Sequence, residues 1–436
     1  MKKYFKNNSV LNNASWIVGC KIIQSLISFL IGTITARYLG PSNYGLINYA
    51  ASLVAFVTPI MQLGFNETLV QEFVKEPEDS GKILGTSLVL NITAAIASII
   101  GVCSFAIATN EKNSITTWVC FLYSLTLLFQ ATEMSVYWFQ SQLLSKYTSV
   151  TSLIAHFIGA GYKAYLLISG KRVVWFALTH VIEACFISLA LLILFRKYSK
   201  QRLSFSLQFG KTLFLKSRHY IISGLMVVIF QQTDKIMLKF MTGAEEVGFY
   251  SSSLTCMAIT GFVFMAIIDS ARPWVLQGKM SSDSEFSSRL KVLFSIVHFV
   301  SLAQSIVMTV FAKPIVSILF GQEYLPAANV LRVAVWYTTF GYMGTIRNIW
   351  ILANDQQKYL PIVNLSGALL NVVANYALIP RFGSIGAAVA SLMTQLFANF
   401  VICFMIKPIR ESGMIILQST NPKVLINVLK NIYSQQ

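Results

Sequence analysis

Long apolar stretches, separated by short polar or glycine-containing segments, make up most of the chain. A transmembrane helix needs about 20 mostly apolar residues, and twelve stretches are of that kind. They show no alternation with a period of two and are too long for barrel strands, so we expect helices, which satisfy their own backbone hydrogen bonds in lipid. The predicted spans are residues 14–36, 46–69, 83–108, 116–138, 150–169, 174–195, 219–241, 249–270, 292–312, 330–352, 360–379 and 384–406. The sequence therefore predicts an all-α polytopic membrane protein with about twelve transmembrane helices.

Lysine and arginine gather in alternate connections between these stretches. Short cytoplasmic loops collect positive charge, so the pattern places the N-terminus in the cytoplasm, and an even number of spans returns the C-terminus to the same side. The net charge of +17 then reflects membrane topology and does not indicate nucleic-acid binding. The basic N-terminal stretch has no small-residue cleavage site after its apolar run, so we expect it to remain as the first span.

The most basic of the inner loops, residues 196–218, divides the predicted helices into two equal sets. The predicted parts are an N-terminal lobe (1–200), a basic cytoplasmic linker (201–218), a C-terminal lobe (219–406) and a cytoplasmic tail (407–436). A weak internal repeat agrees, because residues 34–49 resemble residues 236–250. Two halves repeated in parallel are typical of transporters with their path at the interface of the halves. Chance similarity between the ends of apolar helices is the alternative.

Composition excludes several classes of protein. Only 12% of the residues are charged, against about 25% in soluble domains, so an ordinary globular enzyme is excluded. The six cysteines stand alone in apolar stretches and the four histidines are scattered, so we expect no metal site, no disulfide framework and no cofactor. The chain has no GxxxxGK[ST] motif, which argues against ATP hydrolysis by the chain itself. The predicted outer loops are too short to hold a catalytic domain.

Polar side chains inside the predicted spans recur at helical spacing. Such groups are costly in lipid, so they are expected to face a water-filled cavity or each other. Three consecutive spans, 116–138, 150–169 and 174–195, carry Gln130, Glu133, Tyr137 and Gln140, then His156 and Lys163, then His180 and Glu183. In the second half, span 219–241 carries Gln231, Lys235 and Lys239 beside Asp234, and span 360–379 carries Asn364, Asn371 and Asn375. We interpret them as a shared hydrophilic interior. Hydrogen bonding between helices is the simpler alternative for the amides taken singly.

Several motifs at helix ends resemble one family. Residues 37–45, RYLGPSNYG, are similar to the R-x-L-G-P-x-x-Y-G pattern of polysaccharide (O-antigen) flippases of the Wzx type, in the multidrug/oligosaccharidyl-lipid/polysaccharide exporter superfamily. The supporting pieces are WFQ at 138–140, DKIML at 234–238, VGFY at 247–250, FGQEY at 320–324 and GSIGAA at 383–388. The resemblance covers about residues 10–406.

This resemblance implies a transporter and not an enzyme, with two six-helix lobes around a central cavity as in the MATE transporters. The implied activity is alternating access that carries undecaprenyl-diphosphate-linked oligosaccharide units from the cytoplasmic to the periplasmic leaflet of the bacterial inner membrane, for O-antigen or capsule biosynthesis. Implied partners are the lipid-linked glycan, membrane lipids, a glycan polymerase and a chain-length regulator. The alternatives are a drug/cation antiporter of the same superfamily and a membrane glycan polymerase.

A diphosphate needs cations, which Arg and Lys supply. The candidates for substrate binding, chosen by position and charge, are Lys21, Lys163, Lys235, Arg347, Arg37 and Arg332. For those near span ends, extension of the side chain to the membrane interface is the alternative. The candidates for ion coupling are Glu133, Glu183 and Asp234, because a low-dielectric site favours the uncharged form of a carboxylate. Lys163 and Glu183 fall on consecutive spans and could simply neutralise each other.

Overall fold

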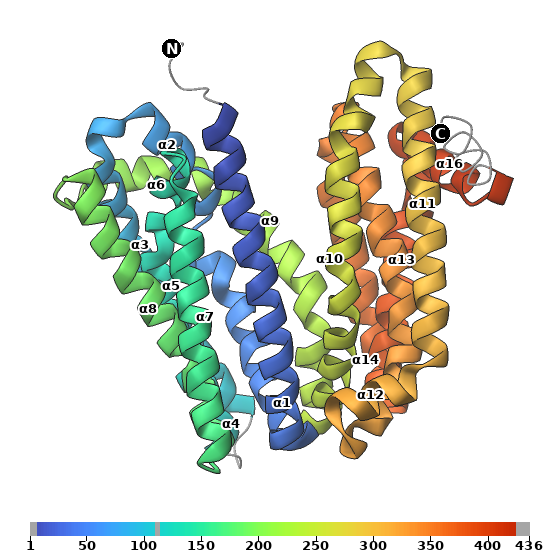
Figure 1. The fold of residues 1–436 in the computed structure, drawn as a ribbon, viewed down its shortest axis with the longest axis horizontal. Coiled ribbons are helices and arrows are strands. Elements are labelled where there is room, and N and C mark those ends of the chain that lie inside the picture. The colour runs from blue at the N-terminus through green and yellow to red at the C-terminus, as the bar shows by residue number, and fades with distance from the viewer. Residues whose placement is uncertain (1–6, 110–113, 424–436) are drawn as a thin grey trace. The chain divides into compact units, whose positions relative to one another are not determined.

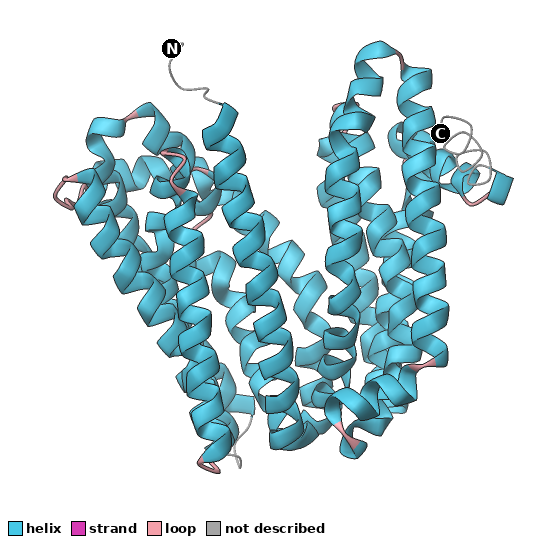
Figure 2. Ribbon diagram, in the orientation of Figure 1, coloured by secondary structure: helices cyan, strands magenta, loops and turns pink. Residues whose placement is uncertain are grey.

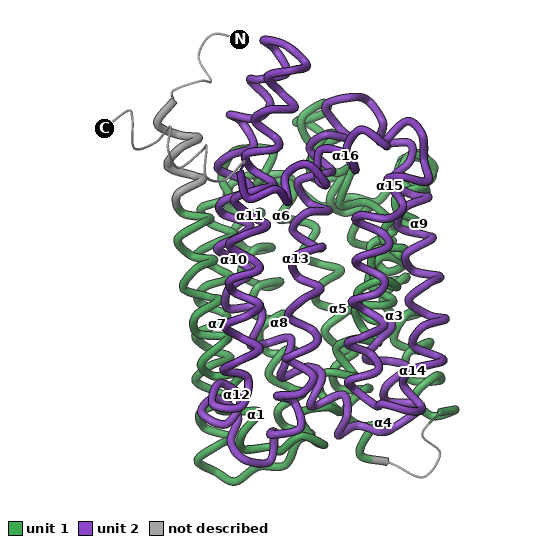
Figure 3. The backbone as a smooth tube through the Cα atoms, turned by 90° about the vertical axis from the view of Figure 1, so that its right-hand side faces the viewer, with its two compact units in different colours: residues 1–232 green, residues 233–436 purple. Residues whose placement is uncertain are grey.

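The computed structural model describes residues 7–109 and 114–423, and in these residues it contains helices and short connections but no strand (Figure 2). The chain forms two compact units, residues 1–232 and 233–436, which Figure 3 colours separately. Eight helical stretches of the described chain are long and apolar enough to cross a membrane. The predicted all-α, polytopic membrane class is thereby confirmed, whereas the count of twelve spans stays a prediction.

Unit 1 contains the N-terminal helices (Figure 1). Its elements are α1 (Asn7–Met61), the 3-10 turns η1 (Phe65–Glu67), η2 (Pro77–Asp79) and η3 (Ala131–Met134), and the helices α2 (Leu69–Lys75), α3 (Ser80–Thr109), α4 (Ser114–Ser124), α5 (Thr126–Gln130), α6 (Ser135–Ser141), α7 (Ser145–Ile168), α8 (Val173–Ser199) and the first part of α9 (Leu207–Met241). Buried aromatic residues such as Phe65, Phe139 and Phe195 form part of its core.

Unit 2 begins within α9, at Thr233. Its further elements are α10 (Ala244–Ser281), α11 (Asp283–Val310), α12 (Ala312–Phe320), η4 (Gln322–Tyr324), α13 (Leu325–Ala353), η5 (Gln357–Tyr359), α14 (Leu360–Leu396), the π-helix η6 (Phe397–Val401), α15 (Ile402–Met405), η7 (Lys407–Ile409) and α16 (Arg410–Ser419). Ile415 and Ile416 of α16 are buried in the core of this unit. The first part of the predicted tail is therefore packed, and residues 424–436 lie outside the described residues.

Two long helices are broken at glycines with positive φ. In α1, Gly40 (φ 72°, ψ 169°) interrupts the helix directly before Pro41. Two residues before the break, the Tyr38 hydroxyl donates a hydrogen bond to the backbone carbonyl of Lys171 at 3.3 Å. In α14 the break is at Gly383 (φ 56°, ψ −134°). Glycine populates such backbone angles without the steric penalty of a Cβ. The glycines of the RYLGPSNYG and GSIGAA motifs thus have a structural role.

The second break is capped from another helix. Glu246, in the first turn of α10, accepts a hydrogen bond from the backbone N–H of Ser384 at 2.7 Å, and its carboxylate lies against Gly383. A carboxylate at the start of a helical segment satisfies an N–H group that has no intrahelical partner. The contact therefore joins α10 to the break in α14.

Replacing Glu246 with alanine is expected to lower the free energy of unfolding by about 1–2 kcal/mol, because the Ser384 N–H loses a charged cap. The measurement is the midpoint of thermal unfolding of the purified protein in detergent. Glu245→Ala is the matched control, since its neighbouring carboxylate is exposed. Equal midpoints for the two variants would contradict the proposed cap.

The segment predicted as a linker packs along unit 1. The backbone N–H of Gly81 donates to Gln201 Oε1 at 2.6 Å, and the Ser206 N–H donates to Thr86 Oγ1 at 3.1 Å. Farther along, in the first part of α9, Lys216 Nζ pairs with the buried Glu72 carboxylate at 2.9 Å. Residues 201–218 are therefore bound to α2 and α3 by side-chain and backbone contacts.

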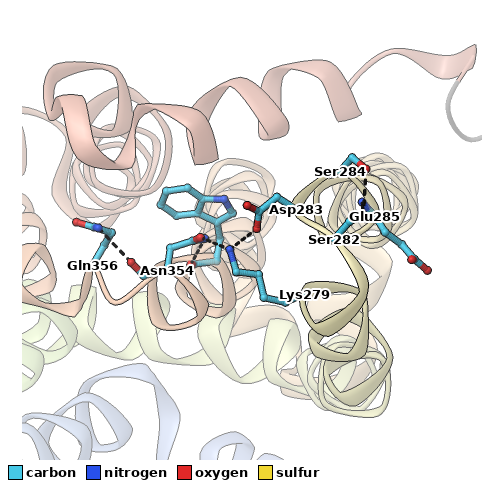
Figure 4. Close-up of polar contacts among 8 residues, drawn as sticks. Lys279, Ser282, Asp283, Ser284, Glu285, Asn354 and Gln356 are labelled. Atoms are coloured by element: carbon cyan, nitrogen blue, oxygen red, sulfur yellow. Dashed lines mark hydrogen bonds and ion pairs between the residues drawn. The ribbon is translucent and has the colours of Figure 1, made fainter.

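The α10–α11 hairpin turns through a single residue, Ser282, whose hydroxyl accepts the backbone N–H of Glu285 (Figure 4). Lys279 donates to Asp283 Oδ1 at 2.5 Å and to Asn354 Oδ1 at 2.7 Å. Asn354 directly follows α13, so these bonds attach the tip of the hairpin to the end of that helix. These bonds stabilise the short connection at the end of two long helices.

Candidate functional site

Unit 1 contains a cavity of about 420 Å³. It lies between α1 and the broken helical segment that runs from α4 to α6. Its apolar wall is made of Ala, Val and Met side chains, and its polar lining residues are Thr58, Gln62, Tyr123, Gln130, Glu133 and Tyr137. The predicted common face of Gln130, Glu133 and Tyr137 is confirmed, whereas Gln140 is exposed and is not part of the lining.

Local backbone geometry places Glu133 at the cavity. The predicted span 116–138 is not one regular helix, because the 3-10 turn η3 separates α5 from α6 and carries Glu133. A 3-10 stretch within a helical segment often marks a functional position. Hydropathy cannot show such a turn, and it does not show that Gln62, Thr58 and Tyr123 come from neighbouring elements to complete the lining.

A second polar cluster joins α7 and α8. The carboxylate of Glu183 lies against Gly159, so closely that a Cβ at that glycine would overlap it. Lys163 and His156 lie within electrostatic range of Glu183, but the described residues include no ion pair between Lys163 and Glu183. The ring of His180 contacts that of Tyr123 at a centroid distance of 4.9 Å. Tyr123 therefore connects this cluster to the cavity.

Asp234 is at the centre of a buried network in unit 2. Its side chain, in α9, accepts hydrogen bonds from Tyr250 in α10 and Ser391 in α14, each at 2.5 Å. The amides of Asn371 and Asn375, both in α14, donate to its other oxygen at 3.0 and 2.6 Å. All five residues are buried, and three helices contribute to the network. Four donors match the acceptor capacity of an ionised carboxylate.

Arg347 donates to one backbone carbonyl and one side-chain oxygen beside an irregular helix. Its Nη1 donates to the carbonyl of Ala398 at 2.6 Å, and its Nη2 donates to Asn348 Oδ1 at 3.0 Å. Ala398 belongs to the π-helix η6, and only 2% of Arg347 is exposed. Irregular backbone at membrane depth needs such partners from neighbouring helices. The described contacts of Arg347 are therefore with the protein, at the junction of α13 and η6.

The other predicted cations lie at separate places. Lys21 and Arg37 are exposed on α1. Lys235 is half-buried beside Asp234 and lies within its electrostatic range. Arg332 donates through Nη1 to Asn329 Oδ1 at 3.1 Å and through Nε to the carbonyl of Thr309 at 3.4 Å. A common site for these cations stays a prediction.

Sequence reasoning identified Asp234, Asn371 and Asn375 as polar positions but missed Tyr250 and Ser391. A signal for Tyr250 was present, because it ends the VGFY motif that follows α9. Ser391 lies in an otherwise apolar stretch, and a single serine there carries no periodic signal. Its role depends on the tertiary contact between α9 and α14, which spacing along the chain cannot show.

The comparison with protein families assigns the chain to one of them. Residues 10–279, more than half of the chain, match the family of polysaccharide biosynthesis proteins. The chain belongs to this family. The match includes unit 1 with its cavity as well as Asp234 and Tyr250 of the buried network.

Two relatives are similar to this chain. An uncharacterized membrane protein of Methanocaldococcus jannaschii is 27% identical over 55% of this chain. The matched part of the chain covers only 47% of the length of that relative. A putative O-antigen transporter of Escherichia coli K12 is 20% identical over 89% of this chain and 94% of the relative.

Solved structures show the fold. The lipid II flippase MurJ, in an inward closed conformation, matches with a TM-score of 0.70 and 14% identity, over 95% of this chain and 92% of that one. A multidrug resistance MATE family transporter in an inward-facing conformation matches with a TM-score of 0.67 and 12% identity, over 91% and 96% of the two chains. The chain thus has the fold of these membrane transporters.

Proposed function

We propose that this protein is a flippase for lipid-linked oligosaccharides, a transporter and not an enzyme. The family match is the observation that carries the proposal. The similarity to an O-antigen transporter over nearly the full length of both chains supports it, as does the fold shared with a lipid II flippase. Polar groups buried within apolar helices are the further support, since lipid-facing helices would not keep them.

The proposed cargo is an undecaprenyl-diphosphate-linked glycan unit, carried by alternating access from the cytoplasmic to the outer leaflet of the bacterial inner membrane. Both termini are proposed to be cytoplasmic, as the distribution of Lys and Arg predicts. A glycan polymerase and a chain-length regulator are the proposed protein partners. For the diphosphate, Lys163 and Lys235 are the preferred cations, because both are half-buried in their helices.

Ion coupling is proposed for Asp234. Carboxylate and hydroxyl oxygens are hard ligands for cations, and the network brings the oxygens of Asp234, Tyr250 and Ser391 together in one buried place. Four donors occupy the acceptor sites of the carboxylate, so a coupling cation would take the place of some of these hydrogen bonds. The buried Oδ1 of Asn375 has no hydrogen-bond partner in the described residues, which leaves a further oxygen at this place. Glu183 is the corresponding candidate in unit 1.

Deletion of the gene tests the function. Loss of surface polysaccharide, with full-length lipid-linked units retained in the cytoplasmic leaflet, is the expected result. Units that reach the outer leaflet but remain unpolymerised would favour a glycan polymerase. A drug/cation antiporter is the second candidate, favoured by the fold of MATE transporters; its deletion would leave surface polysaccharide unchanged and increase sensitivity to cationic drugs.

A further inference from the structure

Five polar side chains around the unit 1 cavity have no hydrogen-bond partner among the described residues. In this part of the chain, no hydrogen bond or ion pair is made by the side chains of Gln62, Tyr123, Gln130, Glu133 and Tyr137. All five are half-buried, so their polar atoms remain open to the cavity and to water. Five polar groups that converge on one cavity without bonding to the protein are free to bind a polar ligand.

The charge of the lining restricts what this ligand can be. Glu133 is the only charged residue among those that line the cavity in the described structure, and neither lysine nor arginine is among them. In its ionised form a carboxylate in a confined space repels phosphate and carboxylate groups, and in either form it bonds to hydroxyl groups. An uncharged or cationic ligand therefore fits this lining better than the diphosphate of a lipid carrier does.

The shape and the aromatic residues restrict it further. A volume of about 420 Å³ lies within the range of small-molecule sites, about 300–1,000 Å³. Tyr123 and Tyr137 offer apolar ring faces with a polar hydroxyl at one end, and the contact of Tyr123 with His180 fixes one of these rings. A sugar ring has an apolar face and an edge of hydroxyl groups, which fits tyrosine rings beside amide and carboxylate groups.

We propose that this cavity holds one sugar residue of the transported glycan and that Glu133 makes it selective for neutral or amino sugars over uronic acids. The inference rests on the proposed function and adds a substrate class to it. Gln62 and Gln130 can each donate to and accept from sugar hydroxyls, whereas Glu133 in ionised form can only accept. Glu133 thereby becomes a specificity residue, in place of the ion-coupling role that the sequence suggested.

Binding of simple glycosides to the purified protein in nanodiscs tests the proposal. The probes are methyl glucoside, methyl glucosaminide and methyl glucuronide, and binding is followed by saturation-transfer NMR with titration. Wild-type protein is expected to bind the first two and to bind the glucuronide at least about tenfold more weakly, the ratio expected when one charge-assisted hydrogen bond is replaced by repulsion. In Glu133→Gln, an isosteric change, the glucuronide is expected to bind as well as the glucoside.

Two further variants keep the experiment decisive. Glu78→Gln removes an exposed carboxylate of η2, outside the cavity, and is expected to retain the wild-type preference. Ala55→Leu adds volume at the cavity wall and should weaken all three probes together without changing the charge. If Glu133→Gln fails to fold, as judged by size-exclusion chromatography, two measurements still test the proposal. They are the preference of the wild-type protein among the three glycosides and the weaker binding of all three by Ala55→Leu.

Three results would overturn the proposal. One is wild-type protein that binds the glucuronide as tightly as the glucoside, and another is folded protein that binds none of the probes. The third is a Glu133→Gln variant that keeps the wild-type sugar preference in the binding assay while its glycan export no longer depends on an ion gradient. That result would support a role of Glu133 in ion coupling. Failure of the proposed function is a separate outcome, since it would be seen as unchanged surface polysaccharide after deletion of the gene.

Discussion

Asp234→Asn is expected to abolish most glycan export while the protein remains folded in the membrane. The asparagine side chain has nearly the same shape, but it removes the negative charge on which Tyr250, Ser391, Asn371 and Asn375 converge. A charged hydrogen-bond partner contributes about 1.5–3 kcal/mol, so a coupling cation bound at this carboxylate would lose about ten- to a hundredfold in affinity. The measurement is surface polysaccharide in a deletion strain complemented with the variant.

The matched control is Asp269→Asn, because Asp269 is an exposed carboxylate on α10. If Asp234→Asn does not fold, Ser391→Ala removes one donor of the same carboxylate and keeps its charge; it should lower export partially. Full export by both variants at Asp234 and Ser391 would remove this network from the transport mechanism.

Arg347→Met should lower the free energy of unfolding by about 1–3 kcal/mol, because it leaves a buried carbonyl without its charged donor. That carbonyl belongs to Ala398 in the π-helix, where Arg347 Nη1 donates at 2.6 Å. The expected result is a lower midpoint of thermal unfolding and less protein in the membrane. Arg347→Lys should be intermediate, since an ammonium group lacks the planar fork that serves Ala398 and Asn348 together.

Arg272→Met is the control for this change, because Arg272 is an exposed guanidinium on α10. The same experiment separates the two roles assigned to Arg347. A variant with normal unfolding and abundance but no export would favour the substrate-binding role that the sequence suggested, and would contradict a role at the π-helix.

The helical architecture could be predicted because each helix satisfies its own backbone, so that apolar length alone identifies it. The breaks at Gly40 and Gly383 could not be located by apolar length, since hydropathy does not change at them. Periodicity placed Gln130, Glu133 and Tyr137 on one wall, because the turn η3 between α5 and α6 keeps nearly the helical direction of the chain.

What the sequence could not provide are contacts between distant elements. Gln62 completes the cavity from beyond α1, and Ser391 reaches Asp234 across 157 positions of chain. Arg347 shows the same limit most clearly: a cation in an apolar span fits a substrate site and a structural role equally well until its acceptor is known. That acceptor is the carbonyl of Ala398, in the π-helix that follows α14.

The π-helix also determines which way the following side chains point. A π turn closes its hydrogen bond one residue later than an α turn, and one residue corresponds to about 100° of rotation around an α-helix. The side chains that follow residues 397–401 are therefore turned by about 100° from the direction that an unbroken α14 would give them. In this orientation Ile402 and Cys403 of α15 are buried in the core of unit 2.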